Sequence, residues 1–182
     1  NHIQNSMIDI LNISNTKWKN TKVSVLGGGK SGIAASNLAL SVGAHVLISE
    51  HNDSININTC ENLVIETGGH SDRILDSDII IISPGVSDKI DIVQKGKELK
   101  IPIVSEIEFS SWFTSSPILA ITGSNGKTTT TSLLYKMVKN AGYNAMLGGN
   151  IGIPFSKNVC IELELEQSNT VHILELSSFQ LE

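Results

Sequence analysis

Short apolar segments alternate with stretches of helical periodicity along most of the chain. Ile79–Ser83 begins with four consecutive isoleucines, which is typical of a strand whose two faces are both covered in a parallel sheet. Ser31–Val42 instead repeats its apolar residues at helical spacing. The same alternation predicts further strands at Val23–Leu26, His45–Ser49, Leu63–Glu66, Pro102–Val104, Ile118–Ile121, Ala145–Leu147 and Val171–Leu176, and further helices at Lys89–Leu99, Glu106–Phe113 and about Lys127–Asn140. We therefore expect an α/β fold with parallel sheets.

The segment Thr114–Pro117 interrupts this alternation with the residues TSSP and is the best candidate for a linker. We predict a Rossmann-like domain over residues 1–115 and the start of a P-loop α/β domain over residues 116–182. The second unit is short for an open sheet covered on both faces, so we expect it to be incomplete. Within it, Glu162–Ser168 is predicted to be a solvated charged segment. The chain starts without Met and ends at Glu182 just after a predicted strand, and we expect both ends to be cut.

Composition narrows the class of protein. Of the 182 residues 40% are hydrophobic, which is enough for a core, and the formal net charge is −5. No basic or basic-aromatic cluster is present in the sequence, which argues against a nucleic-acid partner. No apolar run reaches about 18 residues and the first residues do not resemble a signal peptide, so we expect a cytoplasmic protein without a membrane partner. Cys60 and Cys160 are far apart, and two unpaired thiols are the expected state.

The stretch Ile118–Thr131, which reads ILAITGSNGKTTTT, carries the most specific chemical signal. An apolar strand ends in a loop of small residues, and a helix follows. The backbone N–H groups of such a loop and the N-terminus of the helix attract phosphate oxygens. Lys127 is placed to reach the β- and γ-phosphates of a nucleotide, and the Thr128 hydroxyl is placed to bind Mg²⁺. The loop is shorter than the general P-loop pattern, because Ile121 stands where that pattern has glycine. A solvated turn between strand and helix is the alternative.

The segment Gly27–Gly32, with the sequence GGGKSG, follows the first predicted strand and opens the first predicted helix. It contains the G-x-G-x-x-G pattern of dinucleotide-binding folds, and Glu50 follows at about the spacing of a ribose-binding carboxylate. The glycines indicate only that a phosphate or a nucleotide can approach this turn closely. An NAD(P) site, a site for another nucleotide-containing ligand and a tight junction without a ligand all stay open.

Three further features lie at predicted strand ends, where ligands bind in open α/β sheets. Ser83 and Gly85 belong to an SPG turn, and Asn150 lies in a Gly-rich loop where its amide offers both a donor and an acceptor. Glu175 ends a strand next to the phosphate loop and is placed to hold Mg²⁺ directly or through water. The alternatives are plain turns for the first two features and a cap on the turn at Ser177 for Glu175. The five histidines have no metal-ligand spacing, and we expect structural or surface roles for them.

Four segments together resemble one family. GGGKSG after the first strand, SPG after a later strand, TGSNGKTTT, and GGNIG followed by LELSSFQLE are similar to motifs of the Mur ligases. The resemblance runs from about Val23 to Glu182 and covers only the front part of such an enzyme. TG-x-x-GKT is shared with folylpolyglutamate synthases, which lack an N-terminal domain of this kind. ELSSFQLE is more particular and points to the members that add D-glutamate.

The resemblance implies an ATP-dependent ligase of peptidoglycan precursor synthesis, which adds D-glutamate to UDP-N-acetylmuramoyl-L-alanine through an acyl phosphate. The first domain would then hold UDP and not NAD, with Glu50 and His51 on the uracil side. The residues that would bind the UDP-linked substrate are Gly29, Lys30, Ser31, Ser83, Gly85 and Asn150. The residues that would bind ATP are Gly123, Ser124, Asn125, Gly126, Lys127, Thr128 and Thr129. Thr128 and Glu175 would bind Mg²⁺, and Lys127 and Glu175 would be the catalytic residues.

The resemblance also limits what this chain can do alone. The family's later Mg²⁺-binding histidine, its carbamylated lysine and the domain that brings D-glutamate lie beyond Glu182. We therefore expect a monomer that binds the UDP-linked substrate weakly and does not complete the reaction. Three alternatives are a sister ligase for a different amino acid, an NAD(P)-dependent oxidoreductase built on Gly27–Gly32, and a nucleotide-binding module without catalysis.

Overall fold

The computed structural model describes residues 18–166 and 168–177, and the chain forms two compact units that divide between Val104 and Ser105. The division falls before the predicted linker Thr114–Pro117. The reason is that helix α4 (Glu106–Ser111) packs against helix α6 (Phe155–Glu164) of the second unit. Each unit is an α/β layer structure, as the alternation of apolar and helical segments predicts.

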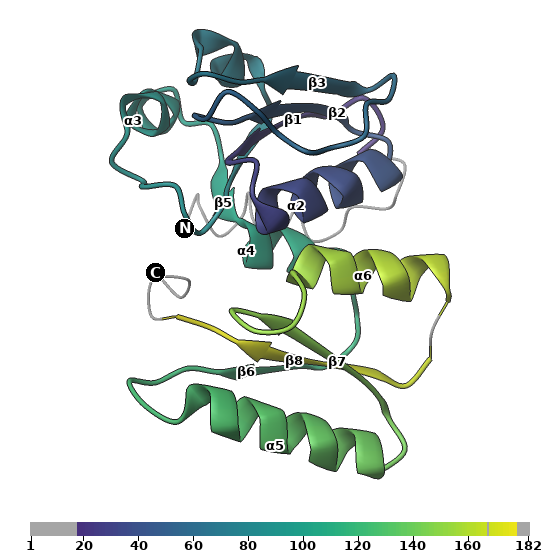
Figure 1. The fold of residues 1–182 in the computed structure, drawn as a ribbon. Coiled ribbons are helices and arrows are strands. Elements are labelled where there is room, and N and C mark those ends of the chain that lie inside the picture. The colour runs from purple at the N-terminus through teal and green to yellow at the C-terminus, as the bar shows by residue number, and fades with distance from the viewer. Residues whose placement is uncertain (1–17, 167, 178–182) are drawn as a thin grey trace. The chain divides into compact units, whose positions relative to one another are not determined.

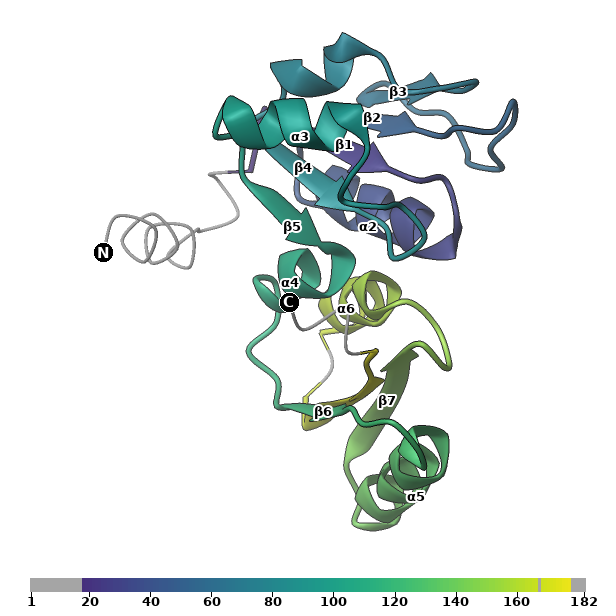
Figure 2. The ribbon, with the colours of Figure 1, turned by 90° about the vertical axis from the view of Figure 1, so that its left-hand side faces the viewer.

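The first unit is built on a five-stranded sheet with the strand order β3-β2-β1-β4-β5 (Figures 1 and 2). The strands are β1 (Lys22–Leu26), β2 (His45–Ser49), β3 (Leu63–Glu66), β4 (Ile79–Ile82) and β5 (Ile103–Ser105). β1 pairs in parallel with both β2 and β4, and β2 pairs in parallel with β3. From β1 the chain adds β2 and β3 on one side, and it then crosses over to add β4 and β5 on the other side. A topological switch point therefore lies between β1 and β4. Ligands bind at such points, outside the carboxyl ends of the strands.

Helices cover both faces of this sheet (Figure 2). Helix α2 (Lys30–Ser41) lies on one face, and helix α3 (Asp91–Glu98) with the 3-10 helix η1 (Asp72–Asp76) lies on the other. Ile80 belongs to the core beneath α3, and its neighbours in the strand point to the opposite face. All of these isoleucine side chains are buried except the last one, Ile82, which is half-buried. The run of isoleucines is therefore explained by a strand covered on both sides, as predicted.

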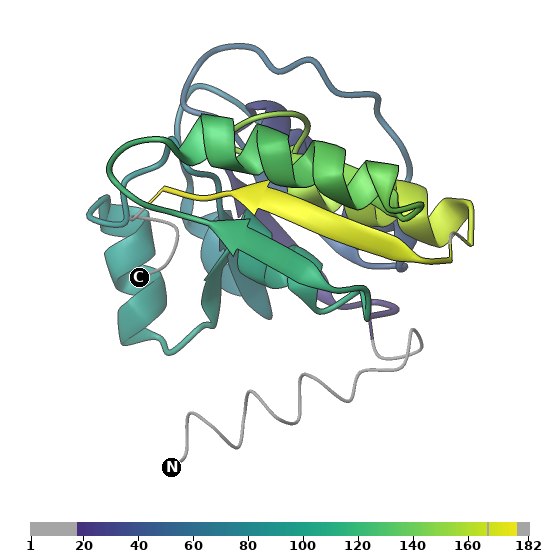
Figure 3. The same cartoon turned by 90° about the horizontal axis from the view of Figure 1, so that it is seen from below.

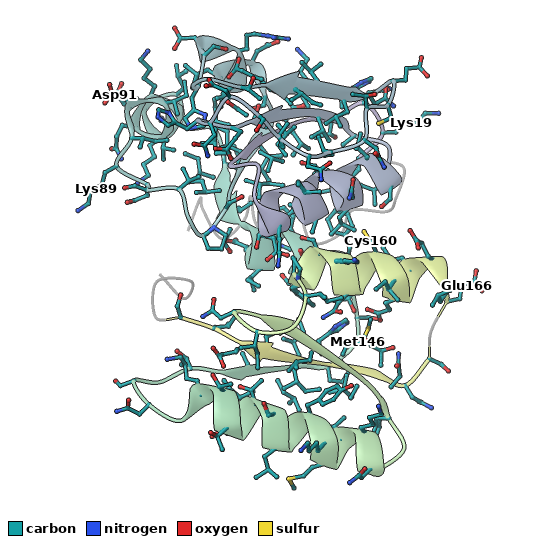
Figure 4. All side chains as sticks on the ribbon, viewed as in Figure 1. Lys19, Lys89, Asp91, Met146, Cys160 and Glu166 are labelled. Atoms are coloured by element: carbon teal, nitrogen blue, oxygen red, sulfur yellow. The ribbon has the colours of Figure 1, made fainter. Side chains whose placement is uncertain are left out.

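The second unit contains a three-stranded parallel sheet with the order β6-β8-β7 (Figures 1 and 3). Its strands are β6 (Ile118–Ile121), β7 (Asn144–Gly149) and β8 (Thr170–Glu175). Helix α5 (Lys127–Asn140) covers one face and α6 covers the other. Figure 4 shows Met146 of β7 extending into the layer between the sheet and α6. Every residue of the central strand β8 is buried.

The predicted solvated segment Glu162–Ser168 is wrong in its first part. Helix α6 continues to Glu164, and the Glu162 side chain is only 12% exposed. Its carboxylate accepts hydrogen bonds from Ser116 and from Thr114 Oγ1 (2.8 Å), and it lies 2.8 Å from Nε2 of the buried His172. Desolvation opposes ionisation of this carboxyl group, but the hydrogen bonds outweigh it and hold the pKa of Glu162 below its ordinary value. A charged residue is largely withdrawn from water here because the fold supplies it with donors.

Two other expectations concern the whole chain. Cys60 and Cys160 are not joined by a disulfide, as predicted. None of the helices in the described part of the chain combines the length and the apolar character needed to cross a bilayer.

Candidate functional site

A cavity of about 640 Å³ opens at the carboxyl edge of the first sheet. The glycine-rich loop after β1 and the SPG turn after β4 line it, so it lies at the topological switch point. The predicted residues that line this cavity are Gly29, Lys30, Ser31, Glu50, His51, Ser83 and Gly85. The structure thus brings together two sequence motifs that are more than fifty residues apart.

The glycine-rich loop is held close to its neighbours. A Cβ atom on Gly32 would lie 1.9 Å from the Gly27 carbonyl oxygen, so only glycine lets α2 begin this close to the end of β1. Ser83 Oγ donates to the same carbonyl oxygen (3.2 Å) and fixes the SPG turn to the loop. Helix α2 starts at Lys30 without an acidic residue in its first turn and without a side-chain cap. Its first N–H groups therefore remain available for an anion.

The Glu50 carboxylate already accepts a hydrogen bond from one backbone N–H group of this loop. Its Oε2 accepts from the Gly28 N–H (2.6 Å), and its Oε1 accepts from the backbone N–H (3.0 Å) and the side-chain amide (2.8 Å) of Asn52. These hydrogen bonds, with those from Asn52 and Gly28 the strongest, lower the pKa of Glu50. The carboxylate is ionised at neutral pH, and an incoming phosphate is left with the donors from Gly29 onward.

His70 also lines the cavity, although sequence reasoning assigned structural or surface roles to all histidines. It follows the end of β3, and its ring centroid lies 6.3 Å from that of His51. Its position in the sequence could have identified it. Like Glu50 and Ser83, His70 follows shortly after the end of a strand, at the carboxyl edge of the sheet.

The phosphate-type loop of the second unit joins β6 to α5, as predicted. Lys127 Nζ donates to the Gly123 carbonyl oxygen (2.6 Å) across the loop. Thr128 Oγ1 donates to Glu175 Oε2 (2.7 Å). This contact forms because β8 lies beside β6 with Glu175 opposite Ile121, the last residue before the loop. The loop residues Ser124, Asn125, Gly126 and Thr129 are exposed to solvent.

Asn150 lies at the same edge. Its backbone N–H donates to the carbonyl oxygen of Glu175 (2.8 Å). The preceding residue, Gly149, has a φ of 89°, and a Cβ atom there would lie 2.2 Å from that carbonyl oxygen. A side chain at Gly149 would thus push the loop of Asn150 away from β8. The structure therefore brings Lys127, Thr128, Glu175 and Asn150 together within the second unit.

The oxygen atoms of Thr128 and Glu175 suit a magnesium ion. Mg²⁺ is usually held by one or two carboxylates together with phosphate oxygens and water, and not by a cage of protein ligands. Across residues 18–166 and 168–177, His, Cys, Asp and Glu side chains form no group of three or more that could hold a metal. One hydroxyl and one carboxylate beside a phosphate-type loop fit an ion that a nucleotide brings with it. The end of the predicted motif, from Ser178 to Glu182, lies outside the described residues.

Comparison with known proteins agrees with these motifs. Residues 121–182 match the Mur ligase middle domain. The chain is 41% identical over 170 residues to the UDP-N-acetylmuramoylalanine--D-glutamate ligase of Chlorobium luteolum, and 42% identical over 173 residues to that of Salinibacter ruber. The relative from Elusimicrobium minutum has the same name and is 43% identical over 176 residues. These matches cover 88–92% of this chain and 36–38% of the relatives, so the chain spans little more than a third of their length.

A solved structure shows the same fold. The pseudomurein peptide ligase type C of Methanothermus fervidus superposes with a TM-score of 0.50 at 22% sequence identity, over 88% of this chain and 33% of that one. The matched family model and the sequence relatives confirm the predicted resemblance to the Mur ligase family. The chain is similar over most of its length to UDP-N-acetylmuramoylalanine--D-glutamate ligases.

Proposed function

We propose that this chain supplies the substrate-binding unit and the phosphate loop of an ATP-dependent ligase that adds D-glutamate to UDP-N-acetylmuramoyl-L-alanine. The observation that carries the proposal is the meeting of Lys127, Thr128 and Glu175 at one sheet edge. It occurs in a chain about 40% identical to relatives with that name. The proposal places the reaction in the cytoplasm and in a monomer.

The first unit would hold the uridine diphosphate part of the substrate. Its diphosphate would lie against the N–H groups of Gly29, Lys30 and Ser31 at the start of α2, and the SPG turn with Ser83 and Gly85 would close the other side. The fixed carboxylate of Glu50 keeps the Gly28 N–H occupied, which restricts the phosphate to the open end of the loop.

The second unit would bind ATP along residues 123–129. Mg²⁺, held by Thr128 and Glu175, would offset the repulsion between the triphosphate and the substrate carboxylate. The alanyl carboxylate oxygen forms a bond to the γ-phosphorus, and the bond to ADP breaks. The amine nitrogen of D-glutamate then bonds to the carbonyl carbon of the acyl phosphate, inorganic phosphate leaves, and the amine loses a proton. Lys127 would stabilise charge on the transferred phosphoryl group, and Asn150 would orient the muramoyl-peptide end.

Two lysine substitutions separate the two binding functions. Lys127→Ala is expected to weaken MgATP binding by about ten- to a hundredfold and to leave UDP-N-acetylmuramoyl-L-alanine binding unchanged, because a hydrogen-bonded charge is lost only from the phosphate loop. Lys30→Ala is expected to weaken UDP-N-acetylmuramoyl-L-alanine binding and to leave MgATP binding unchanged. Lys136→Ala, at an exposed position of the same helix α5, is the matched control. Isothermal titration of the chain measures both ligands, and a Lys127→Ala variant that binds MgATP normally contradicts the proposal.

The amino acid is tested separately. The test uses a protein that contains this chain and is as long as the curated relatives. In it, ADP formation should require D-glutamate and should not occur with L-alanine. ADP formation with another amino acid would support a sister ligase instead. Titration of the chain with NADH examines the oxidoreductase alternative, for which we expect no binding.

A further inference from the structure

The cavity of the first unit extends over the ends of four strands. The SPG turn follows β4, the glycine-rich loop follows β1, Glu50 follows β2, and His70 comes shortly after β3. A nucleoside diphosphate with its phosphates on the glycine-rich loop can extend its nucleoside along this edge toward β2 and β3. His70 is then the side chain at the far end of the cavity, where a base would lie.

The hydrogen bonds around His70 determine which ring nitrogen carries the proton. Nδ1 lies 2.8 Å from the hydroxyl oxygen of the buried Ser49. The same hydroxyl lies 2.8 Å from Glu66 Oε1 and 3.1 Å from the Gly69 carbonyl oxygen, and both of these atoms can only accept. The one proton of Ser49 is therefore directed to them. Nδ1 must donate its own proton to the Ser49 oxygen.

Glu66 is held in its ionised state, which supports this assignment. Desolvation opposes its charge, but hydrogen bonds from the side chain and the backbone of Ser71 and from Ser49 outweigh it, so the pKa of Glu66 is lowered. The carboxylate therefore has no proton to offer to Ser49. The chain Glu66–Ser49–His70 runs in one direction, with each donor pointing toward the carboxylate.

Two effects lower the pKa of His70: burial, which is the larger, and the nearby His51. The carboxylates of Glu66 and Glu50 only partly oppose them. The ring is therefore neutral at pH 7, with its proton on Nδ1 and a lone pair on Nε2. Among the described residues Nε2 has no hydrogen-bond partner. Since the Nδ1 edge is tied to Ser49, the Nε2 edge is the one left for the cavity that the ring lines.

We propose that His70 determines the base specificity of this cavity, accepting through Nε2 a hydrogen bond from the imide N–H of uracil. Uracil presents a donor at N3, whereas cytosine presents a lone pair at the same position. A neutral histidine with its lone pair in the cavity pairs with the first and repels the second. This inference rests on the proposed binding of a uridine diphosphate ligand by the first unit.

The test compares UDP with CDP in isothermal titrations of the chain. With His70 present, we expect UDP to bind about tenfold more tightly than CDP. This is the effect of one hydrogen bond that UDP makes to Nε2, while CDP leaves that acceptor unpaired. His70→Asn keeps an N–H donor near the position of Nδ1 but removes Nε2. It should bring the UDP/CDP ratio close to one by weakening UDP and not CDP. His70→Gln, whose amide oxygen reaches the position of Nε2, should recover part of the ratio.

The outcomes separate the inference from the proposed function. If the unchanged chain binds UDP and His70→Asn keeps the preference, the inference is wrong and the UDP site stands. An equal loss of UDP and CDP in His70→Asn also overturns the inference, because it shows a structural role. If the unchanged chain binds neither nucleotide, the proposed function fails together with the inference. A CDP affinity in His70→Asn that is equal to or tighter than that of the unchanged chain shows that the variant is folded.

Discussion

The hydroxyl of Thr128 donates a hydrogen bond of 2.7 Å to the carboxylate of Glu175, which lies 47 residues away in the chain. Thr128 belongs to the first turn of α5, and Glu175 is the last residue of β8. The contact joins the phosphate-type loop to the strand β8. Both oxygen atoms are of the kind that magnesium prefers, so this pair is the place to test the proposed metal site.

Replacing Glu175 by glutamine should weaken ATP binding only in the presence of magnesium. The amide oxygen can still accept from Thr128, but the negative charge beside the ion is lost. We expect a loss of about 2 kcal/mol, roughly thirtyfold in Kd, in titrations with MgATP. Titrations with ATP and EDTA should give the same Kd for the variant and the native chain. Glu166→Gln, at an exposed position of the same unit, is the control and should change neither value.

Gly149 and Gly142 form a matched pair for a stability experiment. Both have a φ of 89°, but a Cβ atom on Gly142 meets nothing within 4 Å, whereas on Gly149 it would lie 2.2 Å from the Glu175 carbonyl oxygen. Alanine at either position is strained, and only Gly149→Ala also displaces β8. We expect Gly149→Ala to lower the free energy of unfolding by about 1–3 kcal/mol more than Gly142→Ala. Urea denaturation measures the difference, and equal losses would show that the close approach does not matter.

Glu106 should make the second unit less stable as the pH rises. Its side chain is 2% exposed, its Oε1 accepts from the Ser156 N–H (2.5 Å), and burial raises its pKa despite the hydrogen bonds from Ser156. The folded state therefore keeps this proton to a higher pH than the unfolded state. The stabilisation is complete below the ordinary value of 4.5 and declines as the pH rises through the raised folded value. Glu106→Gln should flatten this part of the pH profile of urea unfolding, and an unchanged profile would refute the assignment.

Glu162 should have the opposite dependence. Its pKa is lowered against the effect of desolvation, so its contribution to stability is present above the ordinary value of 4.5 and is lost as the pH falls through the lowered folded value. Glutamine would turn an amide N–H₂ toward donors on Ser116, Thr114 or His172. We expect Glu162→Gln to cost about 1–3 kcal/mol at neutral pH. Glu164→Gln, two residues later and exposed, should stay within about 0.5 kcal/mol of the native chain.

Local patterns were sufficient to predict most of the strands and the position of both glycine-rich loops. The strands His45–Ser49 and Leu63–Glu66 begin and end where the apolar runs do. The glycine-rich loops depend on residues that are adjacent in sequence, so their chemistry is visible without a structure. The expected position of Glu175 beside the phosphate loop is also confirmed, because the parallel register places it opposite Ile121.

The features that sequence reasoning missed depend on distant contacts. Helix α6 was not predicted, because its buried residues include the polar Ser156 and Asn158 and its last turns alternate Glu with Leu. The role of Glu162 follows only from donors on another segment and on β8. His70 acquires its partners from two different strands through Ser49 and Glu66, and a single histidine has no periodicity that would indicate this.

Glu175 makes hydrogen bonds in two directions. Its carboxylate accepts from Thr128, and its carbonyl oxygen accepts from the N–H of Asn150. A nucleotide that moves the carboxylate therefore also acts on the residue proposed to touch the muramoyl peptide. Thermodynamic reciprocity then requires that each ligand change the affinity for the other by the same factor. If the proposed function holds, the end of this one strand would couple the binding of the phosphoryl donor to that of its acceptor.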